Sequence, residues 1–346
     1  YSKRDPPHPR CCQPGDKNKD STARAADMVV LGFLEEVEDQ AEMQSQFFPC
    51  KVGGDPAWLD LQADRIPQPP LRCQHCAQPM QFLLQLYAPL SAQCCSDAFH
   101  RSLFLFVCAQ QECQQLPHRA RCLRMQLPRE NAVYASQPSE DGSAPIQCVV
   151  DTTVESWRGE GKFTEWDVVT EEEEVEQVSP SGPEGSSGEV TWEEAQRITE
   201  KFSSVALEEG DLEGLVVQED KCFREFQRQT QASPDQVIRF HVEEERVEGK
   251  SPLWVAETGQ LESSHIPNCS QCHGPRVLEF QVLPQLLHFL GVEKLQARGL
   301  DHLDWGTIVV YSCLQSCSLA RDDPATRVGW VEEYAYVQNM HQQTPK

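Results

Sequence analysis

Two stretches of this chain decide its fold: CQHCAQPMQFLLQLYAPL, residues 73–90, and CSQCHGPRVLEFQVLPQL, residues 269–286. Placed in register, both begin with C-x-x-C, both have proline three residues after the second cysteine, and both carry glutamine at the same later position, Gln85 and Gln281. Each stretch is followed by an apolar run that ends in a further pair of cysteines, SLFLFVCAQQEC and GTIVVYSCLQSC. The unit therefore occurs twice, and the sequence predicts two related halves.

The paired cysteines of each unit have the spacing of a metal site. Structural zinc takes four soft ligands in a tetrahedron, and a short loop between two thiolates supplies two corners. We expect two zinc ions, held by Cys73, Cys76, Cys108 and Cys113 and by Cys269, Cys272, Cys313 and Cys317. Buried thiols or disulfides are the alternative for each group. Four thiolates leave no position for water or substrate, so these ions would serve structure rather than catalysis.

Other cysteines and three histidines are weaker candidates. His75, His100 and His273 could each replace a cysteine ligand, although a surface or supporting position is the favoured interpretation. The cysteines without a matching spacing are interpreted as small buried residues or surface thiols; they are Cys50, Cys94, Cys95, Cys122, Cys148 and Cys222.

The charge of the chain restricts its partners. Its 346 residues include 54 acidic and 30 basic residues, which give a net charge of -24. Binding to duplex nucleic acid requires clustered Lys and Arg, so we expect no such partner and no membrane, and favour a basic protein instead. We find neither a leader segment nor an apolar run of about 18 residues, and therefore expect a reducing compartment, where paired cysteines bind metal.

The composition divides the chain into four parts. Residues 1–28 are expected to be a disordered extension, 29–135 the N-terminal half, 136–190 an acidic disordered linker and 191–346 the C-terminal half. Residues 155–248 hold 26 acidic and 9 basic residues, so much of the net charge is local. The predicted fold is α+β and rich in strands, with two zinc-ribbon-like units joined by the acidic insert.

Apolar periodicity predicts the main elements. Short apolar runs at 82–90, 102–107 and 307–313 indicate strands. Helices are predicted at 191–202, where Thr191 and Glu194 form a capping box, at 219–231, and from Ser233 onward. A further helix is predicted at 284–291, between Pro284 and Gly291.

One charge run is a candidate for partner binding. Glu171, Glu172, Glu173 and Glu174 lie in a Ser/Gly/Pro-rich context, which favours a solvated linker. The alternative is that these carboxylates lie along a basic segment of a partner protein, where they would increase the association rate and the specificity of binding.

Two short motifs have a partial resemblance to enzyme motifs. His241, Glu243 and PNCSQC at 267–272 resemble the H-x-E and P-C-x-x-C pattern of zinc deaminases, but Asn268 separates the proline from Cys269. KVGGDP at 51–56 lacks the G-K-[ST] end of a phosphate-binding loop. No nucleophile and base stand out, so we expect that the protein is not an enzyme and keep deamination as a remote alternative.

The chain resembles the programmed cell death protein 2 family, in its first half through FFPCKVGGDPAWL, CQHCAQPMQFLLQLYAPL, DAFHRSLFLFVC and LPREN, and in its second through SPLW, LEFQVLPQLL and LDWGTIVVYSCLQSCSL. The resemblance covers about residues 29–135 and 220–337. It implies a dedicated chaperone of a small-subunit ribosomal protein, universal small-subunit protein five or eukaryotic S-two. Such proteins act in the cytoplasm and nucleus and support assembly of the 40S subunit. An acidic zinc-ribbon scaffold with another protein partner is the alternative.

The chain departs from this family at one point. The founding branch carries a MYND zinc finger between its halves, which needs about seven cysteines and a histidine. Here Cys222 is the one cysteine between Cys148 and Cys269, and DTTVESWRGEGKF stands where the finger would be. The chain is therefore expected to be a finger-less isoform or a member of the branch that lacks the finger.

Overall fold

The computed structural model describes residues 29–60, 66–67, 71–91, 95–129, 131, 133–134, 163–173, 220–241, 246–291, 302–319 and 329–340. The described residues up to Glu173 and from Lys221 onward form one compact unit. Both cysteine units lie in it. The two predicted halves thus share a single body.

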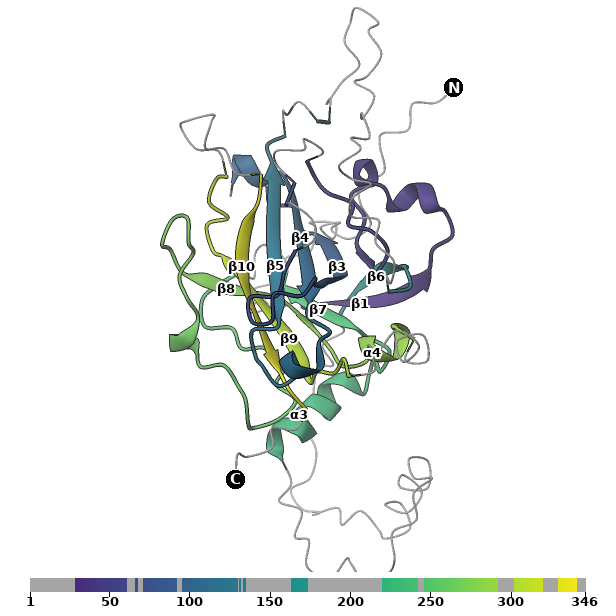
Figure 1. The fold of residues 1–346 in the computed structure, drawn as a ribbon, viewed down its shortest axis with the longest axis vertical. Coiled ribbons are helices and arrows are strands. Elements are labelled where there is room, and N and C mark those ends of the chain that lie inside the picture. Colours follow the sequence, from purple (N-terminus) through teal and green to yellow (C-terminus); the bar gives the residue numbers. More distant parts are fainter. Residues whose placement is uncertain are drawn as a thin grey trace, which may run out of the picture. The chain divides into compact units, whose positions relative to one another are not determined.

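Ten antiparallel strands close into a barrel in the order β1-β6-β2-β3-β4-β5-β10-β9-β8-β7 (Figure 1). The strands are β1 Val29–Glu36, β2 Lys51–Val52, β3 Gln81–Tyr87, β4 His100–Val107, β5 Ala120–Leu127, β6 Trp166–Glu172, β7 Ile238–His241, β8 Arg276–Val282, β9 Thr307–Cys313 and β10 Val331–Gln338. The strands predicted at 82–90, 102–107 and 307–313 are confirmed as β3, β4 and β9. Closure pairs the edges of the sheet, so each strand has two neighbours.

The barrel is built from the duplicated unit. In the first half the C-x-x-C pair precedes β3, the second cysteine pair follows β4, and β5 completes the meander. In the second half β8, β9 and β10 repeat this order. Figure 1 shows the two halves meeting where β5 lies beside β10. The second junction is made by β1, which pairs with both β6 and β7.

Both halves repeat small details of geometry. A register shift interrupts β3 between Phe82 and Leu84, and another interrupts β8 at the equivalent place. The Gln85 side chain accepts a hydrogen bond from the Ala57 amide at 2.8 Å, and Gln281 accepts one from the Leu253 amide at 2.7 Å. Each glutamine thus ties an extended loop segment to the barrel wall. This explains why the same residue occurs at the same offset.

A tryptophan follows each of these tied segments. Trp58 and Trp254 each lie 15 residues before the first cysteine of their unit, at 73 and 269. Trp58 is fully buried against Phe104, with ring centroids 4.6 Å apart, and Trp254 packs edge-on against Tyr336. Removing so large an aromatic surface from water stabilises each half considerably. The repeat therefore extends further upstream than the cysteines alone indicate.

The structure corrects the linker prediction at one segment. Residues 166–172 were expected to be disordered, but they form β6, which pairs with β1 and with β2. The approach to β2 is close, since a β-carbon on Gly53, at φ +69°, would collide with the carbonyl oxygens of residues 163 and 164. The segment WDVV, residues 166–169, pairs with strands that lie more than 100 residues earlier in the sequence. The local composition does not reveal such long-range pairing.

The described residues contain few helices, and the helix predictions have different outcomes. The helix predicted at 219–231 is confirmed as α3, Lys221–Thr230, and the one at 284–291 shortens to α4, Leu286–Phe289. The helix predicted from Ser233 is wrong, because turns bonded through Ser233 lead directly into β7. The helix predicted at 191–202 lies outside the described residues. Within the described residues, no helix has both the length and the apolar character needed to span a membrane.

The junction of β5 and β10 is short and charged. Three residue pairs join the strands, and the Arg124 and Glu333 side chains form an ion pair at 2.7 Å with both side chains fully buried. Arg276 approaches the same carboxylate at 2.9 Å. On the outer face, Arg121 binds Glu332 at 2.7 Å in a partly exposed pair. The junction therefore depends on buried charges that satisfy one another.

Glu333→Gln should destabilise the barrel strongly. The substitution leaves the buried guanidinium groups of Arg124 and Arg276 without a counter-charge, which costs about 3–5 kcal/mol of unfolding free energy. Glu332→Gln is the matched control on the same strand, and should cost less than about 1 kcal/mol because its pair is partly exposed. Urea titration of the purified variants measures both values. Equal losses for the two would contradict this account of the junction.

Candidate metal centres

The eight predicted cysteines form two compact groups. All four sulfur atoms of each group lie within 4.8 Å of one another. The Sγ atoms of Cys73 and Cys113 are 3.9 Å apart, and those of Cys272 and Cys313 are 3.6 Å apart. Four sulfurs at about 2.3 Å from a tetrahedral ion lie about 3.8 Å from each other. Each quartet thus has the size and donor set of a four-coordinate thiolate metal site.

The C-x-x-C turns of the two quartets are nearly identical. The residue after the second cysteine has a left-handed backbone in both, with φ 58° at Ala77 and 59° at His273. The Ala77 amide donates to the Cys73 carbonyl at 3.0 Å, and the His273 amide donates to the Cys269 carbonyl at 2.9 Å. This turn brings two sulfur atoms to the same side of the chain. Holding non-glycine residues in this conformation has a cost that a bound ion would offset.

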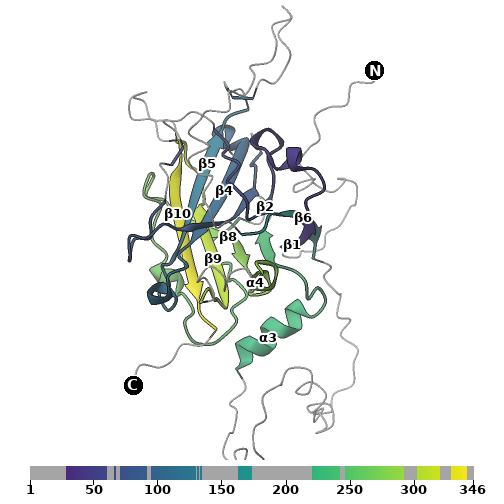
Figure 2. The ribbon, with the colours of Figure 1, turned by 45° about the vertical axis from the view of Figure 1, so that its right-hand side comes forward.

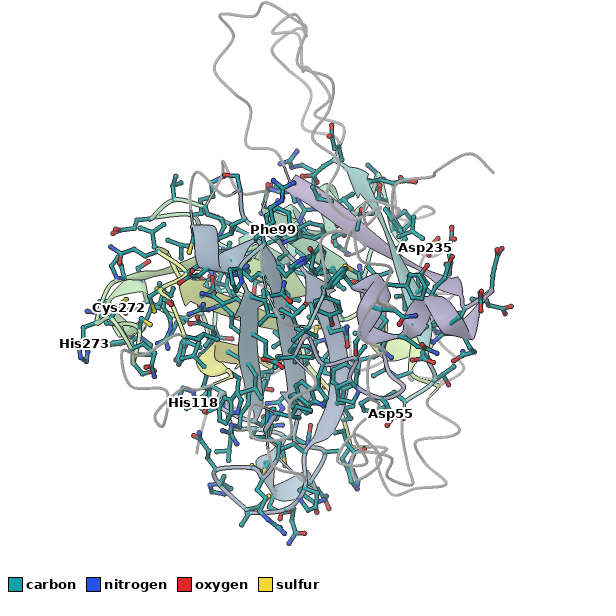
Figure 3. All side chains as sticks on the ribbon, turned by 90° about the horizontal axis from the view of Figure 1, so that it is seen from above. Asp55, Phe99, His118, Asp235, Cys272 and His273 are labelled. Atoms are coloured by element: carbon teal, nitrogen blue, oxygen red, sulfur yellow. The ribbon has the colours of Figure 1, made fainter. Side chains whose placement is uncertain are left out.

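The histidines do not join the quartets. His273 lies at the outer edge of the molecule beside Cys272 (Figure 3), and its backbone serves the turn. His100 instead stacks on Phe48 with centroids 4.6 Å apart and shares a 2.9 Å hydrogen bond with the Tyr87 hydroxyl. Burial lowers the pKa of His100 to about 4, so it is neutral at neutral pH. The two groups that could hold a metal consist of cysteine alone, and His75 is in neither.

The structure describes four cysteines outside the quartets: Cys50, Cys95, Cys122 and Cys222. Cys50 and Cys122 are buried in the main core. The half-buried Cys95 thiol donates to the Ser316 carbonyl at 3.4 Å, and Cys222 lies on α3. Cys94 and Cys148 lie outside the described residues. The prediction of small buried thiols is confirmed for Cys50 and Cys122.

Each metal loop is held by the opposite half of the barrel. In the first unit the Pro117 carbonyl accepts the Val337 amide at 2.8 Å, and Arg119 donates to the Asp304 carbonyl at 2.6 Å. In the second unit Gln126, on β5, donates to the carbonyls of Ser316 and Cys317. A bound ion would therefore strengthen the contact between the halves as well as its own loop.

The thiols of a quartet differ in acidity. Hydrogen bonding from Cys317 lowers the pKa of Cys313 to about 4, with a further contribution from the nearby Arg124 guanidinium. In the same quartet, hydrogen bonding with Cys313 and burial raise the pKa of Cys317. In the first quartet, burial raises the pKa of Cys113 to about 12. Because a metal binds thiolates, loading such a quartet releases protons, and metal affinity falls as the pH falls.

The candidate partner residues lie at the end of β6. Glu171 and Glu172 are exposed, whereas the Glu173 carboxylate binds Arg239 on β7 at 2.7 Å. Glu174 lies outside the described residues. The start of the acidic run is thus anchored to the barrel, and Glu173 has a structural contact of its own.

A cavity of about 550 Å³ opens beside this anchored end. Its walls include Glu173, Glu225 on α3, Arg239, and the apolar side chains of Trp254 and Leu278. Figure 2 shows α3 outside the strands. The residues of α3 that line the cavity are Lys221, Cys222, Glu225 and Gln229. The volume lies in the range of small-molecule binding sites. The cavity has no signature in the sequence, because its walls come from six separate segments of the chain.

The comparison with known proteins assigns the chain to a family. The profile of the N-terminal domain of programmed cell death protein 2 matches residues 28–141, and that of its C-terminal domain matches residues 220–339. The chain belongs to the programmed cell death protein 2 family. The resemblance predicted from the sequence is therefore confirmed. Each family domain contains one of the two quartets.

Relatives cover almost the whole chain. Rat programmed cell death protein 2 is 31% identical over 90% of this chain and 96% of its own length, and human programmed cell death protein 2-like is 25% identical over 77% and 85%. A Schizosaccharomyces pombe protein named probable 20S rRNA accumulation protein 4 is 22% identical over 87% and 94%. No solved structure matches the chain.

The purified protein should contain one metal ion for each intact cysteine quartet. We expect two equivalents of metal per chain in the purified protein, falling to one for Cys73→Ser and one for Cys269→Ser, because a lost thiolate removes much of a binding energy of order 10 kcal/mol. Cys50→Ser is the control, since Cys50 is buried but belongs to neither quartet. Elemental mass spectrometry measures the content. A folded protein without metal would refute both sites.

Proposed function

We propose that this protein is a dedicated chaperone of a newly made small-subunit ribosomal protein, universal small-subunit protein five or eukaryotic S-two, in 40S ribosome assembly. Family membership carries the proposal, since the relative from Schizosaccharomyces pombe is named for 20S rRNA accumulation. Its role would be binding rather than catalysis, in the cytoplasm and nucleus. The relatives above are named as programmed cell death proteins and not as enzymes.

Charge supports a basic client. Ribosomal proteins carry dense Lys and Arg and bind RNA non-specifically before assembly. A chaperone with a net charge of -24 attracts such a client and competes with RNA for it. Glu171 and Glu172 are exposed and directly precede Glu173, which lines the cavity, so an extended basic segment could contact both the acidic run and the cavity.

We further propose that the metal of both quartets is zinc. Four thiolates in a tetrahedron of this size suit zinc, which has no redox chemistry and is common in closed structural sites. Such ions would make the binding surface rigid without taking part in a reaction. The acidic zinc-ribbon scaffold with another protein partner remains the second candidate, supported by the same charge and the same quartets.

Capture from cell lysate distinguishes these functions. The tagged protein should retain one ribosomal protein in about equal molar amount, also after nuclease treatment, because the contact is direct. Quantitative mass spectrometry of the bound fraction measures the ratio. Many unrelated proteins at low occupancy would favour the scaffold, and absence of any ribosomal protein would refute the chaperone proposal.

The acidic run should influence association with the client. Glu171→Gln, Glu172→Gln and Glu174→Gln combined should slow association and flatten its dependence on salt, leaving dissociation nearly unchanged, since exposed charges act over a Debye length of about 8 Å. Glu173 is kept because it binds Arg239.

The matched control carries Glu42→Gln, Glu112→Gln and Glu248→Gln, which remove three exposed carboxylates elsewhere. Stopped-flow association with the purified ribosomal protein, from low to physiological salt, measures both triple variants. Equal rates for the two would identify the run as a linker.

A further inference from the structure

A buried cluster of charged side chains lies beside the second cysteine quartet. It consists of four arginines and two glutamates whose side chains are each at most 6% exposed: Arg101, Arg124, Arg246, Arg276, Glu279 and Glu333. These residues come from both halves of the barrel. So many ionised groups in a protein interior require close mutual compensation.

The pairing within the cluster is close. Arg101 donates two hydrogen bonds to Glu279, at 2.6 and 2.9 Å, and Arg246 approaches the same carboxylate at 3.1 Å. Glu333 receives Arg124 at 2.7 Å and Arg276 at 2.9 Å. Each carboxylate therefore serves two guanidinium groups.

The cluster is not neutral by itself. Guanidinium groups stay protonated in proteins, so four of them facing two carboxylates leave two positive charges in the interior. The buried Nε atom of Arg101 has no hydrogen-bond partner. The neighbouring Arg121–Glu332 pair is balanced and partly exposed, and contributes no net charge. Uncompensated buried charge is costly, which points to a further anionic group nearby.

The second quartet can supply that group. A divalent ion bound by four thiolates carries two negative charges in total. An Nη atom of Arg124 lies 3.8 Å from the Cys317 sulfur, and Arg246 donates to the Cys313 carbonyl at 2.8 Å. Arg276 donates to the carbonyls of Pro267 and Asn268, directly before the C-x-x-C turn. Three of the four arginines thus contact the segments that hold the quartet.

We propose that the buried arginine cluster is the counter-charge of the metal-loaded second quartet, with Arg124 as the positioning residue that joins the two. The arginine cluster and the metal-loaded quartet then stabilise one another. The metal ion of the second quartet is therefore released more slowly than the ion of the first quartet. This inference rests on the proposed binding of zinc and is independent of the proposed client.

The first quartet lacks an equivalent cluster among the described residues. The buried arginine beside it, Arg119, directs its hydrogen bonds to the carbonyls of Leu116 and Asp304. Arg72 donates to the Ala77 carbonyl from an exposed position. The two duplicated sites have the same sulfur geometry but different electrostatic surroundings, and this difference predicts different metal retention.

Metal release from Arg124→Met tests the proposal. The purified zinc-loaded protein is mixed with excess 4-(2-pyridylazo)resorcinol, while iodoacetamide labelling read by peptide mass spectrometry shows which cysteines open. Arg124→Met should accelerate release and labelling at Cys269 and Cys317 about 10–100-fold, as lost outer contacts do at other metal sites. Labelling at Cys73 and Cys113 should keep the wild-type rate.

Arg121→Met is the matched control, because Arg121 lies on the same strand and also pairs with β10. It should leave release from the second quartet unchanged. If Arg124→Met does not fold, Arg124→Lys replaces it and must release the second metal faster than Arg121→Lys, since one ammonium cannot reproduce the guanidinium contacts to Glu333 and Cys317.

Several results would overturn the proposal: wild-type release from the second quartet in the Arg124 variant, equal acceleration at both quartets, or slower release from the first quartet in the unmodified protein. A protein that binds no metal at all would instead refute the zinc proposal. Failure of the arginine inference and failure of zinc binding are therefore distinguishable.

Discussion

Closing a duplicated sheet into one barrel requires the two copies to join at a seam, and here the seam is β5 against β10. Three residue pairs form it, so backbone hydrogen bonds alone are few. The buried Arg124–Glu333 pair provides the contact at this place, and Arg276 shares the same carboxylate. A buried ion pair is not strongly stabilising in itself, but breaking it is costly. The seam therefore specifies one way of closing the barrel.

The cysteine quartets reinforce the same closure. Each loop that carries a second cysteine pair forms hydrogen bonds with the opposite half, so each of the two duplicated sites connects the halves of the barrel. Short loops around metal sites contribute little apolar core, and their order depends on the ion. Metal binding and seam formation are thus expected to be coupled, and a chain without metal would lose contacts in both halves.

The segment between the halves contributes to the barrel at both of its ends. At its first end, β6 lies between β1 and β2 in the barrel. At its second end, α3 packs through Phe226 on Val255 and Leu283. The acidic run therefore begins in a barrel strand rather than in the middle of a linker, next to a cavity whose walls include Trp254 and Leu278. A partner that binds there would meet a fixed surface and a charged segment together.

The sequence by itself determined the duplication, the eight metal-binding candidates, the main strands and the family, because these depend on spacing and local periodicity. It could also have shown that Trp58 and Trp254 repeat at one distance from the cysteines. The barrel, the strand β6 and the arginine cluster were decided only by tertiary structure. Arg101 and Glu279 are 178 residues apart, and an arginine in a strand has no local pattern that marks it as buried. Such contacts depend on long-range pairing, which brings charges together only when the sheet closes.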